Sequence, residues 1–367
     1  MSTLRRSWLH IEWDWPLLAS LLPLCVISLL NLYSATRVAP AGMFSHQIGF
    51  FVAGVALFIG LMAFDYRRLA RLAWPIYVGS VALLAAVLVI GRTVNGSKRW
   101  LGLGVLGGQP SELMKLALIL FYARLFSSDP LDLRARPVYY AVAWHVVLLA
   151  PVLLILKQPD LGTALLCVIV AGSLLLLVPL HPRVKAVMLG LDLSVATAVF
   201  LFGLKTYQKK RLLTFLHPES DPTGTGWHAR QAICAIGSGR VLGKGYLRGT
   251  QNQLQFLPEH WTDFPFAVWA EEWGLVGCLL LLVLYLVLIL WALRVARDAR
   301  DRFGRYLAIG CAALLFWHVA INIAMVVGMA PVVGVTLPWV SYGGSSLLVS
   351  FAALGMLGSV AQRRFSY

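Results

Sequence analysis

The sequence predicts an all-α integral membrane protein of about ten transmembrane helices, with both termini cytoplasmic and one long ordered extracytoplasmic loop. Three observations predict this fold: the composition, the lengths of the apolar segments, and the distribution of lysine and arginine. Hydrophobic residues make up 59% of the 367 residues and charged residues only 13%, and the mean hydropathy is +0.77. Soluble domains carry about 25% charged residues, so we expect a bilayer to be the solvent of this chain.

The apolar segments set the number of spans, because a helix needs roughly 20 residues to cross a hydrocarbon core about 30 Å thick. The ten predicted spans lie near residues 16–36, 44–64, 70–91, 111–127, 137–156, 161–180, 186–204, 264–293, 305–329 and 342–361. The first span is not followed by a cleavage site of small residues and a soluble domain, as a removable signal peptide would be, so it is expected to remain as an anchor. Residues 1–367 are therefore expected to form a single polytopic membrane domain.

The orientation follows from lysine and arginine, which resist translocation when they lie in short connections. Alternate connections contain Arg5, Arg6, Arg67, Arg68, Arg71, Arg124, Arg134, Arg136, Arg183, Lys185, Arg294, Arg297, Arg300, Arg302, Arg305, Arg363 and Arg364. This side and both termini are expected in the cytoplasm. The opposite side receives a long basic loop at about residues 205–263, where helical apolar spacing over residues 227–236, ended by Gly237 and Gly239, predicts ordered structure.

The net charge of +15 does not indicate a nucleic-acid partner. More than half of the basic residues belong to the cytoplasmic connections, where they set the topology and meet anionic lipid. The five cysteines are scattered and show no paired spacing, so neither a disulfide framework nor a zinc site is expected.

Ionisable residues at membrane depth are the informative exceptions, because each costs a few kcal/mol unless it is paired or hydrated. Glu112 and Lys115 lie at spacing i, i+3 at the start of the fourth span, so they share a helix face as an ion pair. That pair either only helps the span to pack or forms the wall of a polar cavity. Asp160 follows Pro159 at the start of the sixth span, so its carboxylate either caps the helix or has a functional role.

Asp263 precedes the eighth span and has two readings, a helix cap, which the spacing favours, and a general base. Glu271 and Glu272 lie eight or nine helical residues further on, about 12–13 Å along the axis. This exceeds the roughly 5–10 Å that separates two carboxylates acting on one glycosidic centre, so both are expected to satisfy polar groups inside the bundle. Ser341 begins a small polar entry to the last span, which close helix packing explains equally well.

Six sequence blocks carry a resemblance to one family. The blocks are NGSKRWLGLG at 95–104, QPSELMKL at 109–116, QPDLGTALL at 158–166, AIGSGRVLGKGYLRG at 235–249, GTQNQLQFLPEHWTDFPFAVWAEEWG at 249–274 and INIAMVVGMAPVVGVTLPWVSYGGSS at 321–346. Together they resemble the SEDS family (shape, elongation, division and sporulation), nearly end to end and in its RodA branch.

The resemblance implies a peptidoglycan glycosyltransferase that polymerises lipid II into β-1,4 glycan strands during cell elongation, with a class B penicillin-binding protein as partner. It implies an active site on the outer face of the cytoplasmic membrane, with the aspartate of the family motif falling on Asp263. Other polar positions of the family fall on Arg99, Glu112, Lys115, Asp160 and Ser341. Two departures flank Asp263: Trp261 replaces a usual histidine, with His260 before it, and Pro265 replaces a branched aliphatic residue.

The chemistry expected from this resemblance is direct, inverting displacement, in which Asp263 removes the proton of a sugar hydroxyl. The loop cations Arg211, Arg240, Lys244 and Arg248, with Arg99, are candidates to stabilise the departing pyrophosphate or to attract anionic headgroups. No cofactor is evident, although a divalent cation remains open. A lipid II flippase or other transporter, or a non-catalytic scaffold for a penicillin-binding protein, are the alternative functions.

Overall fold

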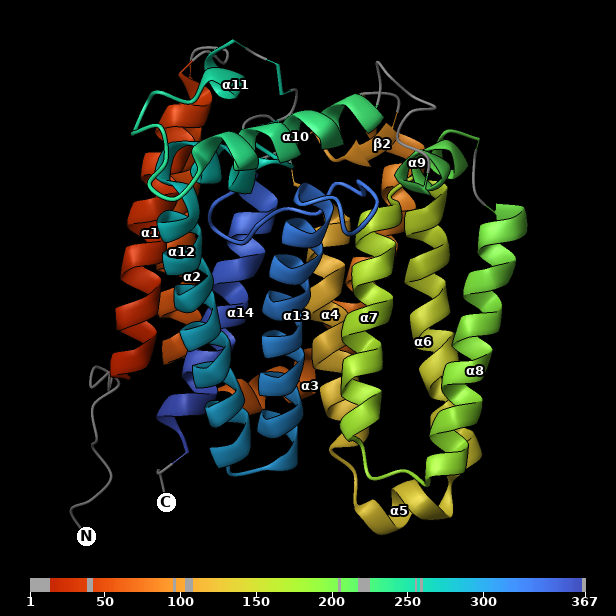
Figure 1. Ribbon diagram of the computed structural model, residues 1–367. Coiled ribbons are helices and arrows are strands. Elements are labelled where there is room, and N and C mark those ends of the chain that lie inside the picture. Colours follow the sequence, from red (N-terminus) through yellow and green to blue (C-terminus); the bar gives the residue numbers. More distant parts are fainter. Residues whose placement is uncertain are drawn as a thin grey trace, which may run out of the picture.

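A computed structural model describes residues 14–37, 42–94, 97–102, 108–203, 206–216, 225–254, 256–257 and 260–364. Within them, ten long helices run between two ends of a bundle (Figure 1). They are α1 (Trp15–Thr36), α2 (Met43–Ala63), α3 (Tyr66–Ile90), α4 (Pro110–Phe126), α6 (Pro137–Lys157), α7 (Leu161–Leu177), α8 (Pro182–Ala198), α12 (Pro265–Asp298), α13 (Arg302–Val326) and α14 (Gly344–Gln362). Each predicted span coincides with one of them, which confirms an all-α membrane protein.

The connecting segments include short helices and one small sheet. These are α5 (Pro130–Ala135), a π-helical turn at Val199–Gly203, α9 (Thr206–Leu216), α10 (Thr225–Gly239), α11 (Thr250–Gln253), and the antiparallel strands β1 (Arg92–Val94) and β2 (Ser97–Trp100). The helix predicted within the long loop is therefore confirmed as α10. Pro218, Pro222 and Gly224 predict a turn earlier in this loop, and they lie outside the described residues.

Membrane crossing is best supported for eight of the described helices, which are long and apolar enough to span a bilayer. The other two long helices, α4 and α7, have 17 residues each, or about 26 Å at 1.5 Å per residue. That is slightly less than a hydrocarbon core of about 30 Å. The number of crossings and the compartment of each end therefore remain predictions.

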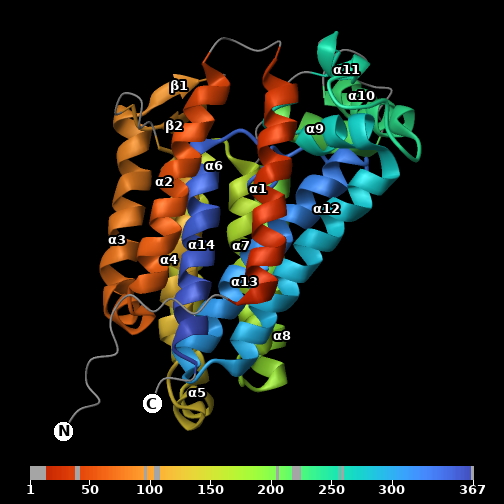
Figure 2. The ribbon, with the colours of Figure 1, turned by 90° about the vertical axis from the view of Figure 1, so that its left-hand side faces the viewer.

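The centre of the bundle holds α4, α13 and α14 (Figures 1 and 2), and α8 lies at one edge (Figure 1). In the most apolar 18-residue stretch of α14, 78% of the residues are buried, against 6% in that of α8. Small residues let the central helices approach closely: a Cβ on Gly310 of α13 would lie 2.5 Å from Ile119 of α4, and one on Gly54 of α2 would lie 2.3 Å from Phe351 of α14. The enclosed position of α4 explains why it tolerates ionisable residues.

The eighth predicted span is longer than expected and is broken at Gly274, whose φ of +62° suits glycine. At the break, the Leu275 and Val276 amides donate to the carbonyls of Arg240 and Val241, at 2.9 and 3.1 Å. In return, Lys244 N and Gly245 N each donate at 3.0 Å to the carbonyls of Glu271 and Glu272. The loop thus satisfies backbone groups that an interrupted helix would leave without partners inside a membrane.

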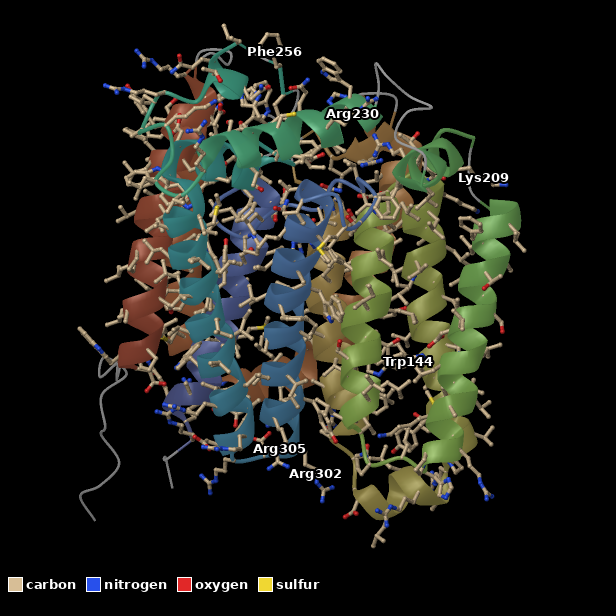
Figure 3. The ribbon with its side chains drawn as sticks, viewed as in Figure 1. Trp144, Lys209, Arg230, Phe256, Arg302 and Arg305 are labelled. Carbon is tan, nitrogen blue, oxygen red and sulfur yellow. The ribbon has the colours of Figure 1, made fainter. Side chains whose placement is uncertain are left out.

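The ends of the described chain lie at the same end of the bundle as α5 (Figure 1). An ion pair of 2.7 Å between Arg364 Nη2 and Asp14 Oδ1 joins them. Arg302 and Arg305 lie at this end too, whereas Lys209 and Arg230 lie with α9 and α10 at the other (Figure 3). The separation agrees with the predicted division of the basic residues between two sides.

Candidate active site

Asp263 lies in a turn between the long loop and α12, with its side chain partly exposed. The N-cap position of α12 belongs to Phe264, so the expectation that Asp263 caps this helix is wrong. Asn322 of α13 holds the main chain of the turn, because its Nδ2 donates at 3.0 Å to the carbonyl of Asp263 and at 2.7 Å to that of Val335. A Cβ on Gly334 would lie 3.5 Å from Asp263 Oδ2. The carboxylate therefore faces the segment between α13 and α14.

The turn is also anchored on the side preceding Asp263. The Tyr342 amide donates to the Trp261 carbonyl at 2.7 Å. The two ring nitrogens of buried His260 lie 2.6 and 3.0 Å from the carbonyls of Leu257 and Ala35, which ties the turn to α1.

Pro265 occupies the first turn of α12, where the missing amide removes no helical hydrogen bond. Its carbonyl accepts from Asn31 Nδ2 of α1 at 3.1 Å. This departure from the family pattern is therefore compatible with the helix start, and the contact with α1 uses the main chain, so it does not depend on the proline.

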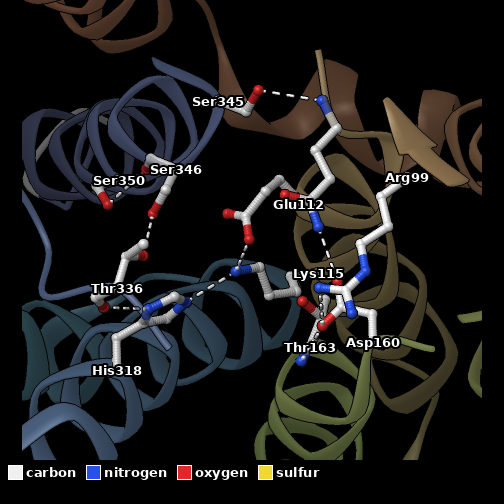
Figure 4. A network of polar contacts seen from close by, with 11 residues as sticks. Arg99, Glu112, Lys115, Asp160, Thr163, His318, Thr336, Ser345, Ser346 and Ser350 are labelled. Atoms are coloured by element: carbon white, nitrogen blue, oxygen red, sulfur yellow. Dashed lines mark hydrogen bonds and ion pairs between the residues drawn. The ribbon is translucent and has the colours of Figure 1, made fainter. Parts of the chain in front are cut away.

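A network of buried polar side chains crosses the bundle beside this segment (Figure 4). Lys115 Nζ of α4 lies 2.8 Å from Glu112 Oε1 and 2.8 Å from His318 Nε2 of α13. The predicted ion pair is confirmed, and His318 is its third member. His318 Nδ1 lies 2.9 Å from the Thr336 carbonyl, so a neutral ring that donates through Nδ1 and accepts from Lys115 satisfies both contacts. Glu112 Oε2 has no hydrogen-bond partner among the described residues.

The network continues into α14, where Thr336 Oγ1 lies 2.6 Å from Ser346 Oγ. Thr336 is two residues from Gly334, which faces Asp263. The segment between α13 and α14 therefore lies between the buried ion pair and the candidate base. Two side chains of α13 hold it in place: His318 contacts the Thr336 carbonyl, and Asn322 donates to the Val335 carbonyl.

Asp160 is the N-cap of α7, and its Oδ1 accepts from the Thr163 amide at 3.2 Å. The cap reading is confirmed, and Pro159 precedes the cap. Gln109 Nε2 donates to Asp160 Oδ2 at 2.7 Å. Arg99 Nη1 lies 3.9 Å from Asp160 Oδ1, and its Nε donates to the Gln158 carbonyl at 3.1 Å. Arg99 thus packs the β2 hairpin against the start of α7.

The four loop cations proposed for a pyrophosphate do not form one cluster in the structure. Lys244 Nζ is paired with Glu271 Oε1 at 2.6 Å, and the Thr250 hydroxyl and the Gln251 amide also bond Glu271. Arg240 and Arg248 are exposed near this pair. Arg211 lies in α9, which Figure 1 places at the opposite end of α10.

The predicted roles of Glu271 and Glu272 inside the bundle are confirmed. Glu271 binds the loop through Lys244, and Glu272 accepts a hydrogen bond from the Ser34 hydroxyl of α1. Ser341 is buried and its Oγ accepts from the Leu337 amide at 2.7 Å, so it shapes the turn before α14. Its predicted contact with substrate stays a prediction.

His318 and Asn322 were not among the residues selected from the sequence. The signal was present, because both are polar residues inside a predicted span and lie four residues apart on one helix face. Among the described residues, no three His, Cys, Asp or Glu side chains are grouped so that they could hold a metal ion. The divalent cation left open by the sequence stays a prediction.

These features define a polytopic helical membrane protein with a structured loop, a partly exposed carboxylate where that loop meets α12, and a buried polar network. The FtsW, RodA and SpoVE model, described as cell cycle protein, matches residues 14–365. The Escherichia coli K12 protein named peptidoglycan glycosyltransferase MrdB is 41% identical over 97% of this chain and 95% of its own length. The chain belongs to this family.

Two solved structures support the same assignment. A chain from a peptidoglycan synthase complex superposes with a TM-score of 0.82 at 34% identity, covering 97% of this chain and all of that one. The rod shape determining protein RodA of Thermus thermophilus superposes with a TM-score of 0.71 at 30% identity, covering 98% and 99%. The resemblance drawn from the sequence blocks is confirmed.

Proposed function

We propose that this chain is a peptidoglycan glycosyltransferase that polymerises lipid II into β-1,4-linked glycan strands, with Asp263 as the general base. The activity is supported by the name of the Escherichia coli relative, whose length the match covers almost completely. The observation that supports the role of Asp263 is its setting. Its carboxylate is partly exposed, and the main chain of its turn is held by hydrogen bonds from Asn322 to the Asp263 carbonyl and from the Tyr342 amide to the Trp261 carbonyl. Such anchoring suits a base that must meet a substrate in one geometry.

In this mechanism, the acceptor is the 4-hydroxyl of a lipid II sugar and the donor is a glycan held through an undecaprenyl pyrophosphate. Asp263 takes the hydroxyl proton as the oxygen attacks the anomeric carbon, and the bond to the pyrophosphate breaks. Attack from the face opposite the leaving group inverts an α-linked donor into a β-linked product. General-base assistance of this kind typically contributes about 10²- to 10⁴-fold to the rate.

Negative charge develops on the departing pyrophosphate and needs cationic partners. Arg240 and Arg248 are the first candidates, because their side chains are exposed on the loop near α12. Lys244 is already paired with buried Glu271, so its main effect is to hold the loop. Arg211 would contribute only to a substrate that extends as far as α9.

The proposal places the chain in the cytoplasmic membrane with the loop and Asp263 on the extracytoplasmic face, and gives it a class B penicillin-binding protein as partner. Arginines in the connections at the end of the bundle where Asp14 and Arg364 lie support a cytoplasmic position for that end. The similarity to a chain of a peptidoglycan synthase complex supports a partner protein.

The test is polymerisation of lipid II by the purified chain, measured as glycan length with and without the partner. Asp263→Asn, which keeps the shape but cannot take a proton, should lower the rate by about 10²- to 10⁴-fold and leave lipid II binding unchanged. Asp298→Asn, at the other end of α12, is the matched control and should retain full activity. Full polymerisation by Asp263→Asn would exclude the mechanism, and glycan made only in the active site of the partner would indicate a scaffold.

A further inference from the structure

The end of the bundle opposite Asp263 contains a hollow of about 120 Å³. It lies where two links, from α4 to α5 and from α7 to α8, meet the beginning of α13. Its lining residues include Phe126, Leu133, Pro179, Arg302, Arg305 and Tyr306. Figure 3 shows Arg302 and Arg305 at this end. The volume corresponds to about four water molecules, enough for one phosphate group with a few neighbouring atoms.

Two arginines line this hollow, and neither forms an ion pair with a described side chain. Arg302 and Arg305 lie at spacing i, i+3 on one face of α13 and are exposed. Neither has a described carboxylate within 4 Å. The nearest acid in sequence, Asp301, is engaged elsewhere, because its Oδ1 accepts from the Gly304 amide at 2.7 Å and its Oδ2 lies 3.8 Å from Arg67 Nε. Among the described residues, Arg302 Nη1 donates to the Ser128 carbonyl at 2.9 Å.

The floor of the hollow is apolar and preformed. Phe126 and Leu133 are 0% and 1% exposed, and Tyr306 is 7% exposed. The rings of Phe126 and Tyr306 pack edge to face with centroids 6.3 Å apart. The Tyr306 hydroxyl has no hydrogen-bond partner in the described part of the chain, so it offers one more donor. A basic rim over an apolar floor suits an amphipathic anion better than a simple inorganic one.

We propose that this hollow binds the phosphate group of an anionic phospholipid. Arg302 and Arg305 would contact the phosphate oxygens, which guanidinium groups bind in a forked geometry. Partly exposed Pro179 would contact the carbon atoms next to the phosphate, above the buried side chains of Phe126 and Leu133. Basic pockets between transmembrane helices bind anionic headgroups in this way. The proposal depends on the arrangement at this end of the bundle and is independent of the role of Asp263.

The test measures lipid binding to the purified full-length chain by native mass spectrometry. Dioleoylphosphatidylglycerol is compared with dioleoylphosphatidylcholine, which has the same phosphodiester but no net charge. The wild type should prefer phosphatidylglycerol, and each arginine replaced by glutamine should weaken its binding about fivefold. The double variant Arg302→Gln/Arg305→Gln should therefore lose about 25-fold, while Arg302→Lys/Arg305→Lys keeps most of the binding.

The matched control is Arg294→Gln/Arg297→Gln, which removes two exposed arginines from the same end but outside the hollow. An equal loss in this control would overturn the proposal, because it would show diffuse attraction rather than a site. Displacement of phosphatidylglycerol by inorganic phosphate would also overturn it, in favour of a free anion. Unchanged Tm and unchanged glycan synthesis in phosphatidylcholine micelles should accompany the loss of lipid binding, which keeps this test separate from that of Asp263.

Discussion

Asn322 joins the main chain of Asp263 to the segment that its carboxylate faces. A single Nδ2 donates to the Asp263 carbonyl at 3.0 Å and to the Val335 carbonyl at 2.7 Å. Asn322 is fully buried, its bond to the Val335 carbonyl is buried, and its bond to the Asp263 carbonyl is partly buried. The position of the candidate base therefore depends on a residue 59 positions away in the sequence.

Asn322→Leu keeps the branched shape of the side chain but removes both donors, and leaves two carbonyls without this partner. We expect the rate of glycan synthesis to fall about 10- to 100-fold through misplacement of Asp263. The Michaelis constant for lipid II should change less than kcat, because the substituted residue lies behind the turn. Steady-state kinetics on lipid II measure this difference, and a change confined to the Michaelis constant would contradict the positioning role.

Lys115→Met leaves the Glu112 carboxylate without its cation inside the bundle, and it also removes the contact with His318. We expect a loss of about 3–5 kcal/mol of stability, because an uncompensated buried charge is costly. The double variant Glu112→Gln/Lys115→Met should recover part of the loss, since no charge remains. Thermal unfolding in detergent compares the two, and equal Tm values for both variants would contradict a coupled pair.

Gly274→Ala tests the exchange of hydrogen bonds between α12 and the loop. The added Cβ would lie 2.3 Å from Gly243 N, at a φ of +62°, so the loop must separate from α12. We expect a loss of about 1–3 kcal/mol and faster proteolysis between residues 239 and 250. Gly172→Ala is the control, because nothing lies within 4 Å of its Cβ position; equal proteolysis of both variants would argue against the exchange.

Asp192→Leu tests how the edge helix α8 is held. Asp192 Oδ2 accepts from Trp144 Nε1 of α6 at 3.0 Å, and its Oδ1 lies 3.3 Å from His145 Nε2. Interhelical hydrogen bonds in membranes contribute about 0.6–2 kcal/mol, so amide exchange in α8 should accelerate about 3- to 30-fold. Ser194→Ala, an exposed neighbour whose hydroxyl donates to the Gly190 carbonyl of the same helix, should leave exchange unchanged. An unchanged rate of amide exchange in α8 of the Asp192→Leu variant would show that apolar contacts alone hold this helix.

The sequence determined those features that depend on local spacing or on the thickness of a bilayer. Apolar length placed all ten long helices, because a buried backbone in lipid must bond to itself within each segment. The pairing of Glu112 with Lys115 could be predicted because the two residues lie one helical turn apart. The cap at Asp160 could be predicted because this residue immediately precedes the first turn of α7. For Asp263 the same local rules favoured a cap, which the structure assigns to Phe264.

Only the tertiary structure decided which distant groups meet. His318 contacts Lys115 across 203 residues, and the break at Gly274 is stabilised because the loop at residues 240–245 supplies its backbone partners. Lys244, a candidate pyrophosphate ligand by sequence, is engaged by Glu271 instead. Periodicity within a segment specifies which face of a helix is polar, but the partner of that face depends on how the helices pack, which no local pattern encodes.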